Sequence, residues 1–347
     1  MVSKHLLNIV MLIEVGLLVL AIGLFFLHGL WLYFHDRRLL KRTTAARDSL
    51  TRLVTSGFIN VEDTDALGKL PHDAQVTAFL EISRNLSGAG KERLRFIAAR
   101  VGLIDRARKL CESRMWTRRL RGARILSRLD VPDPLVEKLL GDPHPALRAQ
   151  AAEWAAAQPS VPVISAMLGL LADPATQARF AVQNALLRMG GVVAGPLAAF
   201  LETHSGRAVE AGLRVAESLA EVSFCPAALT LSGDEDAGIR VAAARLLGAI
   251  GGAAVAERLT ELLRDEDSKV RAAAAFSLGR MQHWQSAPQI AECLRDPKWR
   301  VRRDAGLALR AIGAPGALFL RRALKGDDRF AADMAQQVLD LPMAAAG

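Results

Sequence analysis

The chain is poor in aromatic residues and in cysteine. Only 5% of its 347 residues are Phe, Trp or Tyr, although 51% are apolar, so alanine and leucine supply most of the hydrophobicity. Because strands favour β-branched and aromatic residues, this composition predicts an all-α fold. The three cysteines, Cys111, Cys225 and Cys293, are far apart and lack the spacing of a metal site. A disulfide framework is therefore not expected, and we predict that they are small buried apolar residues.

Motifs of catalysis are also missing. The seven histidines stand singly, and the sequence has no HExxH, no glycine-rich phosphate loop at a strand-to-helix junction and no GxSxG. His144 and His204 lie in predicted turns, where a solvated side chain is a simpler interpretation than a metal ligand. The sequence therefore predicts no catalytic residue, no metal site, no cofactor and no enzyme activity.

One apolar run, in contrast, is unusually long. Residues 6–34 read LLNIVMLIEVGLLVLAIGLFFLHGLWLYF. A helix that spans a bilayer needs about 20 apolar residues, whereas a signal peptide has a shorter apolar region and a small-x-small cleavage site, which is not evident here. We predict an uncleaved single-pass transmembrane helix in residues 1–35.

The charges beside this run predict its orientation. Lys4 is the only basic side chain before it, and six follow it: Arg37, Arg38, Lys41, Arg42, Arg47 and Arg52. The positive-inside rule then places the N-terminus outside and the rest of the chain in the cytoplasm. The lack of paired cysteines agrees with a reducing compartment. The predicted location is the inner membrane of a bacterium.

Glu14, Ala21 and His28 recur every seven residues and fall near one face of the predicted transmembrane helix. An ionisable group at the centre of a bilayer costs about 2.5–3.5 kcal/mol and usually faces protein. The pattern favours docking against another membrane protein or a second copy. The alternative is that Glu14 and His28 lie near the two interfaces and snorkel toward water, because a helix of this length exceeds the hydrocarbon thickness.

A unit of about 31 residues repeats along the second half of the chain. DEDAGIRVAAARLLG begins at Asp234, DEDSKVRAAAAFSLG at Asp265 and DPKWRVRRDAGLALR at Asp296. Five units pair an Asp with an Arg six residues later: Asp142 with Arg148, Asp173 with Arg179, Asp234 with Arg240, Asp265 with Arg271, and Asp296 with Arg302. One intervening unit, near residues 203–209, lacks both charges, and Ser113 with Arg119 is a degenerate upstream form. We predict that each Asp caps a helix and that these residues form a ladder of ion pairs from unit to unit.

Each unit continues into a second apolar stretch that often begins with proline, as in CPAALTL and APQIAECLR. Proline suits the first turn of a helix, where its missing N–H has no intrahelical partner in any case. The unit is thus predicted to be a pair of helices, with alanines that let neighbouring helix axes approach closely. Pairs of this length stack into a solenoid, because a single pair cannot bury its apolar face.

These units resemble HEAT repeats, in the short bacterial form known as phycobilisome-lyase-type, over roughly residues 113–325. The resemblance implies a right-handed α-solenoid of about seven HEAT-like helical pairs. It also implies a scaffold that holds a protein partner against a concave face, which we expect the second helices to form. Some bilin lyases share this repeat type, but they are soluble, and the predicted transmembrane helix argues against that role.

The predicted organisation has five parts. They are the transmembrane helix in residues 1–35, a juxtamembrane amphipathic segment and linker in 36–71, a divergent helical pair in 72–112, the repeats in 113–326, and a capping helix with a tail in 327–347. The best linker candidate is the stretch GFINVEDTDALGKLP, residues 57–71.

The net charge of +9 is concentrated at the membrane-proximal end of the repeats, where residues 91–128 contain 13 Lys or Arg and three acidic residues. The predicted basic patch consists of Arg93, Arg95, Arg100, Arg118, Arg119, Arg121 and Arg124. Anionic lipid, an acidic protein partner, nucleic acid and an ordinary solvated surface are all open interpretations. Nucleic acid is the weakest, because Trp116 alone is no stacking platform.

Trp154, Trp284 and Trp299 would anchor a partner if exposed, although packing in the core or in turns is the simpler interpretation. The function predicted from the sequence is a membrane-anchored HEAT-repeat scaffold that positions a protein partner at the cytoplasmic face of the membrane. The alternatives are a membrane-tethered HEAT protein that binds nucleic acid and, less well supported, a protein resembling the bilin lyases.

Overall fold

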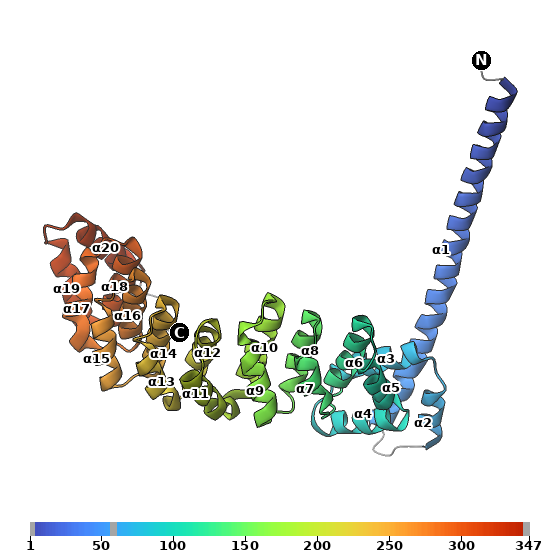
Figure 1. Cartoon of the computed structure of the whole chain (residues 1–347), viewed down its shortest axis with the longest axis horizontal. Coiled ribbons are helices and arrows are strands. Elements are labelled where there is room, and N and C mark those ends of the chain that lie inside the picture. The colour runs from blue at the N-terminus through green and yellow to red at the C-terminus, as the bar shows by residue number, and fades with distance from the viewer. Residues whose placement is uncertain (1–3, 56–60, 343–347) are drawn as a thin grey trace. The chain divides into compact units, whose positions relative to one another are not determined.

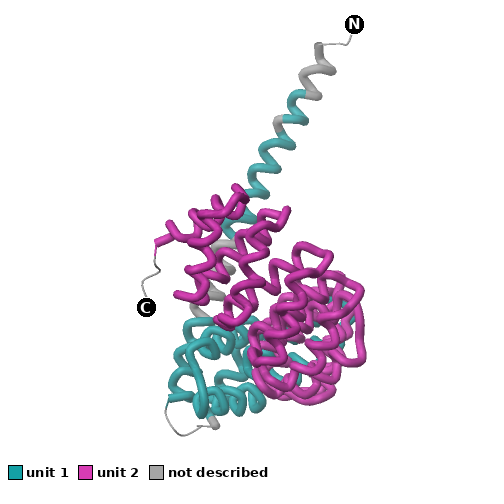
Figure 2. Tube along the Cα trace, turned by 90° about the vertical axis from the view of Figure 1, so that its left-hand side faces the viewer, with its two compact units in different colours: residues 1–131 teal, residues 132–347 magenta. Residues whose placement is uncertain are grey.

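The computed structural model describes residues 4–55 and 61–342, and these residues form helices joined by short turns, with no strand among them. Figure 1 shows the helices in chain order. They group into two compact units, Met1–Val131 and Pro132–Gly347, coloured separately in Figure 2. The all-α fold predicted from the composition is therefore confirmed.

Unit 1 begins with one long helix, α1 (Lys4–Thr55). Its stretch Met11–Leu30 has a mean hydropathy of 2.3 and no buried residue. Near its end the same helix buries Ala46, Leu50 and Leu53 against the rest of unit 1. The spacing of these residues places them on one face, as expected of an amphipathic segment. The exposed apolar stretch and the core of unit 1 thus belong to one uninterrupted helix.

The next segment differs from the predicted linker. Residues 56–60 lie outside the described part of the chain, but α2 (Val61–Gly68) is a helix whose Leu67 is fully buried. The buried Gln75 amide of α3 (His72–Ser83) donates to the carbonyls of Leu67, Gly68 and Leu70 at 2.8–3.0 Å. These bonds reach carbonyls at the end of α2 and just beyond it, which anchors the segment in unit 1.

The segment predicted as one divergent pair, 72–112, also differs. It contains three helices: α3, α4 (Gly88–Arg100) and α5 (Leu103–Cys111). Gly102 adopts a φ of +69° between the last two, a backbone conformation that glycine tolerates and that ends α4. The separate helix α5 then packs on α6 (Trp116–Arg128), where a Cβ on Gly122 would lie 2.5 Å from the Ala107 carbonyl oxygen.

Unit 2 is a stack of helical pairs. Its opening helix is α7 (Leu135–Leu140). The first helices of the pairs are α8 (Pro145–Ala155), α10 (Thr176–Met189), α12 (Arg207–Leu219), α14 (Ala237–Ile250), α16 (Ser268–Arg280) and α18 (Trp299–Ala311). The second helices are α9 (Val161–Gly169), α11 (Ala194–Thr203), α13 (Cys225–Leu231), α15 (Ala253–Leu262), α17 (Ala287–Glu292) and α19 (Ala314–Leu324). The last helix is α20 (Arg329–Asp340).

Prolines open several second helices, as the sequence predicts. Pro162, Pro226, Pro288 and Pro315 occupy the first or second position of α9, α13, α17 and α19. Short 3-10 segments flank several of these helices: Leu170–Ala172, Gly190–Val193, Val222–Phe224, Trp284–Ser286 and Cys293–Arg295. A second apolar stretch, Thr176–Thr203, is long enough to cross a membrane by composition, but it comprises α10 and α11, divided at Gly190, and 39% of it is buried.

The two layers of unit 2 are packed differently. Successive first helices touch along much of their length, except α10 and α12, whereas successive second helices touch little. Small residues allow the close approach: a Cβ on Gly248 would lie 2.4 Å from Ser277 Cβ, and one on Gly279 would lie 2.6 Å from Ala308 Cα. In Figure 1, α8, α10 and α12 lie along one edge of the stack, with α7, α9 and α11 along the other.

This difference in packing curves unit 2 toward its first helices. Arg280 of α16 forms an ion pair with Glu217 of α12 at 3.7 Å, across the intervening α14. Two helices separated by a third can meet in this way only on the concave side. The prediction that the second helices form the concave face is therefore wrong, because the small residues that bring helix axes together lie on the first helices.

Candidate functional site

The recurring Asp and Arg residues meet at the N-terminal ends of the first helices. Arg271 of α16 donates to both carboxylate oxygens of Asp296, from Nε at 2.7 Å and from Nη2 at 3.0 Å. Its Nη1 donates to the carbonyls of Asp265 and Glu266 at 2.8 and 3.0 Å. The Asp lies 25 residues after the Arg, so each pair joins one repeat to the next.

Three such rungs are present in the described part of unit 2. The other two join Arg148 to Asp173, with Nη2–Oδ1 at 2.8 Å, and Arg240 to Asp265, with Nε–Oδ2 at 2.9 Å. All three have side chains no more than 15% exposed on the Arg and 10% on the Asp. Each guanidinium group donates two hydrogen bonds to one carboxylate of the next repeat, and these directional bonds connect successive first helices.

The ladder stops where the next Asp is missing. Arg179 would need a carboxylate in the unit near residues 203–209, and it donates instead to the Asp173 and Pro174 carbonyls and to Thr176 Oγ1. At the far end Arg302 donates to the Asp296 and Pro297 carbonyls, and its guanidinium lies 4.9 Å from the centre of the Phe330 ring. Arg119 makes the same type of bond to the Ser113 and Arg114 carbonyls.

The recurring Asp does not cap the first helix, contrary to the prediction. Each carboxylate accepts from the backbone N–H two residues later, at 2.8 Å, in an Asx turn that precedes the helix. The N-cap itself is the residue two positions on: Asp236 in α14, Asp267 in α16 and His144 in α8, each accepting from a helix N–H. The turn thus holds the carboxylate where the Arg of the preceding repeat can reach it.

Pairing shifts the protonation equilibria of the ladder. The hydrogen bond from Arg148 is the largest cause that lowers the pKa of Asp173, and it outweighs burial. Burial alone would raise the pKa of Asp296, but hydrogen bonds from Arg271 and the Lys298 N–H lower it overall. The same bonds raise the pKa values of Arg148, Arg240 and Arg271. The lowered pKa values of Asp173 and Asp296 keep these two carboxylates charged in their rungs at neutral pH.

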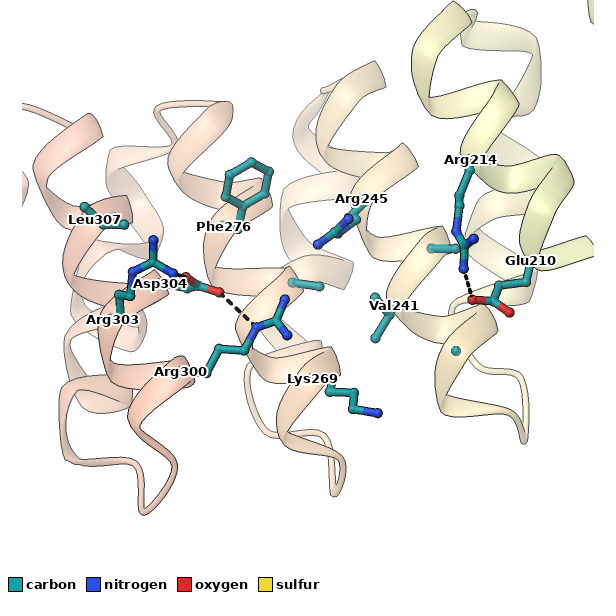
Figure 3. Close-up of a pocket in the computed structure, with 13 residues that line it drawn as sticks. Glu210, Arg214, Val241, Arg245, Lys269, Phe276, Arg300, Arg303, Asp304 and Leu307 are labelled. Carbon is teal, nitrogen blue, oxygen red and sulfur yellow. Dashed lines mark hydrogen bonds and ion pairs between the residues drawn. The ribbon is translucent and has the colours of Figure 1, made fainter. Parts of the chain in front are cut away.

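A groove crosses four of the closely packed first helices, α12, α14, α16 and α18. It has a volume of about 500 Å³. Figure 3 shows the side chains that line it. The lining includes Arg214 from α12, Arg245 and Val241 from α14, Lys269 and Phe276 from α16, and Arg300, Arg303, Asp304 and Leu307 from α18. We call this feature the inner groove, since it lies on the concave side of unit 2.

Positive charge exceeds negative charge in the inner groove. Its lining contains five basic residues but only two acidic ones, Glu210 and Asp304. Glu210 forms an ion pair with Arg214 on the same helix. Asp304 lies 3.9 Å from Arg300 and 4.0 Å from Arg303, and burial raises its pKa while Arg300, Arg303 and Arg245 oppose that effect.

The inner groove was not predicted from the sequence. A signal was present in the last three repeats: the fifth residue after Arg240, Arg271 and Arg302 is Arg245, Phe276 and Leu307, and all three line the groove. Among alanines at helical spacing, these large side chains project from the concave face. Recognising them required knowing that the first helices form that face.

The predicted basic patch is divided between two helices of unit 1. Arg93, Arg95 and Arg100 lie on α4 and the other members on α6. Arg93 and Arg95 donate to the carbonyls of Val54 and Asp130 at 3.3 and 3.0 Å, so these two stabilise the fold of unit 1. Four members on α6 are Arg118, Arg119, Arg121 and Arg124; Arg121 pairs with Asp73, and Arg118 and Arg124 are exposed.

The predicted transmembrane stripe, Glu14, Ala21 and His28, is exposed on α1. Its proposed partner is not present in a single chain, so the docking of this stripe stays a prediction. Of the tryptophans, Trp154 is buried in the core, whereas Trp284 and Trp299 are 60% and 55% exposed. Trp299 adjoins the inner groove, where Arg303 lies 5.6 Å from its ring centre.

The remaining candidate residues are the three cysteines and His204. Cys111 and Cys293 are buried and Cys225 is half-buried, none is in a disulfide, and burial raises the pKa of Cys293 to about 12. His204 stacks on the Phe200 ring at 4.0 Å. Within residues whose placement is described, no three His, Cys, Asp or Glu side chains are grouped so as to hold a metal ion.

Two family models match the repeats. Residues 239–265 match the PBS lyase HEAT-like repeat, and residues 256–340 match HEAT repeats. Residues 239–340 thus contain HEAT repeats. The matches cover α14 to α20, where the Asp and Arg pattern is most regular. They support the predicted family over that part of the chain and leave the transmembrane anchor untested.

The chain also has a low similarity to several solved structures. An engineered protein is 16% identical, with 85% of this chain and 87% of that chain covered and a TM-score of 0.38. The CpcE–CpcF complex of phycocyanin lyase from Nostoc sp. PCC7120 is 17% identical, covering 68% and 93%, with a TM-score of 0.32. Kap121p is 11% identical, covering 87% and 43%, with a TM-score of 0.44. TM-scores of this size carry no functional inference. No curated protein matches the chain in sequence.

Proposed function

We propose that this HEAT-repeat protein is a membrane-anchored scaffold that holds a protein partner in the inner groove, at the cytoplasmic face of a bacterial inner membrane. The observation that carries the proposal is the groove itself: four closely packed helices present an exposed aromatic ring and an excess of cations. HEAT repeats generally bind proteins, and a concave, lined groove is the surface through which a solenoid does so.

The anchor in this proposal is the N-terminal part of α1. Met11–Leu30 contains 20 residues, which at 1.5 Å per residue corresponds to about 30 Å, the thickness of a bilayer core. Ala46, the first buried residue, lies sixteen positions after Leu30, which corresponds to about 24 Å of helix. Six basic residues follow the span, so the positive-inside rule favours a cytoplasmic location for the repeats.

The rigidity of the stack supports a binding function and not a catalytic one. The rungs and the small-residue contacts fix the spacing of the first helices, so the groove is formed before a partner arrives. A preformed site loses less free energy to ordering when it binds. The lining has no pair of groups in hydrogen-bond contact of the kind that activates a nucleophile, and we propose that the protein is not an enzyme.

Site-specific photo-crosslinking in native membranes tests the scaffold. A photoreactive residue at position 307, in the groove, should give a discrete adduct with a second protein. The same residue at position 318, which is 56% exposed on α19 outside the groove, is the matched control. The proposal is wrong if neither position gives an adduct, or if both give the same set.

Anchoring is tested separately. The full chain should stay with the membrane after alkaline extraction, and a C-terminal reporter that is active only outside the cytoplasm should be silent. Release from the membrane would refute the anchor, and an active reporter would refute the orientation.

A further inference from the structure

We infer that the inner groove binds an extended acidic peptide segment that carries at least one large apolar side chain. This inference rests on the proposed function and names the chemistry of its partner. The charges, the exposed ring and the length of the groove each constrain the occupant.

The unbalanced charge lies at one end of the groove. Arg300 and Arg303 on α18 share the single carboxylate of Asp304, at 3.9 and 4.0 Å, and Arg245 on α14 lines the same groove. The side chains of Arg300 and Arg303 are 59% and 51% exposed, so both can turn toward a ligand. Within the described residues, neither Arg245 nor Lys269 has a carboxylate within ion-pair distance. Carboxylates on a partner would supply the missing counter-charges.

An apolar surface lies beside these cations. Phe276 projects from α16 between the arginines and is 49% exposed, with Val241 and Leu307 on the two flanking helices (Figure 3). A single exposed ring is common on protein surfaces, but one that lies in a groove beside two aliphatic side chains and several arginines has the composition of an interface anchor. The combination of arginines with one aromatic and two aliphatic side chains fits a peptide better than a nucleic acid, which would require several rings for base stacking.

The length of the groove limits the segment. The lining comes from four successive first helices, whose axes pack about 9 Å apart, giving about 27 Å from α12 to α18. An extended chain advances about 3.3 Å per residue, so about eight residues cross the groove. The segment runs across the helices, with its acidic residues near α14 and α18 and its apolar residue near Phe276.

Fluorescence anisotropy on the full chain, in micelles of a neutral detergent, tests the inference. The probe is a labelled peptide of about ten residues in which Asp and Glu surround one Phe and one Leu. The comparison peptide has Asn and Gln in place of the acids. The acidic peptide should bind at least about tenfold more tightly at low salt, and its affinity should fall as the salt concentration rises.

Charge variants locate the binding site. The double variant Arg245→Gln with Arg303→Gln should weaken binding of the acidic peptide by about five- to tenfold, since each partly exposed pair contributes at most about fivefold. Its matched control is Arg295→Gln with Arg321→Gln, two exposed arginines outside the groove, which should change the affinity by less than about twofold. Asp304→Asn should tighten binding by about two- to fivefold, because it removes the carboxylate that competes for the same arginines.

The ring is tested in the same assay. Phe276→Ala should weaken binding by about three- to tenfold, whereas Phe330→Ala, at an exposed ring on α20, should leave it unchanged. The gain expected from Asp304→Asn separates a binding role from a structural one, because a variant with a damaged fold does not bind more tightly.

Several results would overturn the inference. They are equal affinity for the acidic and neutral peptides, no binding of the acidic peptide, equal effects of the groove and control variants, or tighter binding of a short single-stranded oligonucleotide of the same charge. If the peptides fail but the crosslink at position 307 is still formed, the scaffold proposal stands and the partner has another chemistry. If both fail, the proposed function falls with the inference.

Discussion

Removal of Arg271 should destabilise the protein far more than removal of a neighbouring surface arginine. Arg271 makes four hydrogen bonds, two to the Asp296 carboxylate and two to backbone carbonyls. Its side chain is 15% exposed and that of Asp296 is 8% exposed. The change Arg271→Ala therefore leaves a nearly buried carboxylate that keeps only its bond from the Lys298 N–H.

The expected loss follows from this burial. Breaking a fully buried pair costs about 3–5 kcal/mol, and an exposed pair is worth at most about 1 kcal/mol. The Arg271 rung is close to the buried limit, so we expect Arg271→Ala to lower the free energy of unfolding by about 2–4 kcal/mol. Arg295→Ala, at an exposed position in the segment that precedes Asp296, should cost less than about 0.5 kcal/mol.

Urea unfolding of the full chain in a neutral detergent, followed by circular dichroism, measures both values. Hydrogen exchange in α16 and α18 shows whether the loss is local, because repeats in a solenoid can unfold separately. Arg271→Ala, Asp296→Asn and their combination form a double-mutant cycle, which isolates the pairing energy. If Arg271→Ala and Arg295→Ala have equally small effects, or if the coupling energy in the cycle is near zero, the rung is not a stabilising contact.

Three further predictions concern packing, acid and lipid. Gly279→Ala should destabilise the protein by about 1–3 kcal/mol, because its Cβ would overlap α18, whereas Gly169→Ala, with no atom within 4 Å, should be neutral or slightly stabilising in the same urea assay. The pKa of Asp173 in the folded protein lies below its unfolded value of about 3.9. The contribution of Asp173 to stability is therefore complete above about pH 3.9 and is lost as the pH falls through the folded pKa. Asp173→Asn should reduce the dependence of the urea midpoint on acid pH. A chain that begins at residue 43 keeps the buried end of α1 and should co-sediment with anionic but not neutral vesicles at about 0.01 M salt. Binding should be weaker at about 0.5 M salt, and also weaker in the variant with Arg118→Gln and Arg124→Gln. No binding at low salt would exclude a lipid site.

The sequence predicted contacts that depend on regular spacing. A repeat of 31 residues with Arg six positions after Asp places Arg271 and Asp296 at equivalent points of adjacent units, so their meeting required only that the units stack alike. The gap at Arg179 was visible for the same reason, since the next unit lacks its Asp. Features set by one local residue were harder to predict. Gly102 divides a stretch that reads as one helix, and Gln75 holds a segment that reads as a linker.

The concave face could not be predicted from composition, because curvature depends on a comparison between two layers. Both layers are rich in alanine and leucine, but the glycine contacts that join successive repeats, at Gly248 and Gly279, lie on first helices, whereas Gly316 of α19 contacts α18 within its own pair. The contacts at Gly248 and Gly279 shorten one side of the stack and create the groove. The same contacts explain why the large side chains of Arg245 and Phe276 line the groove. A large side chain between two first helices would keep the helices apart, whereas one that points into the groove does not.

The ladder and the inner groove are therefore mechanically linked. The Arg240 and Arg271 rungs join α14 to α16 and α16 to α18 at their N-terminal ends, and the groove crosses the same three helices. If the rungs set the spacing of these helices, a broken rung changes the distance between the cations on α14 and α18 without removing any of them. Peptide affinity in Arg271→Ala, measured where circular dichroism shows the helices intact, should then fall even though this residue does not line the groove. Unchanged affinity in a destabilised variant would mean that the small-residue contacts alone determine the shape of the groove.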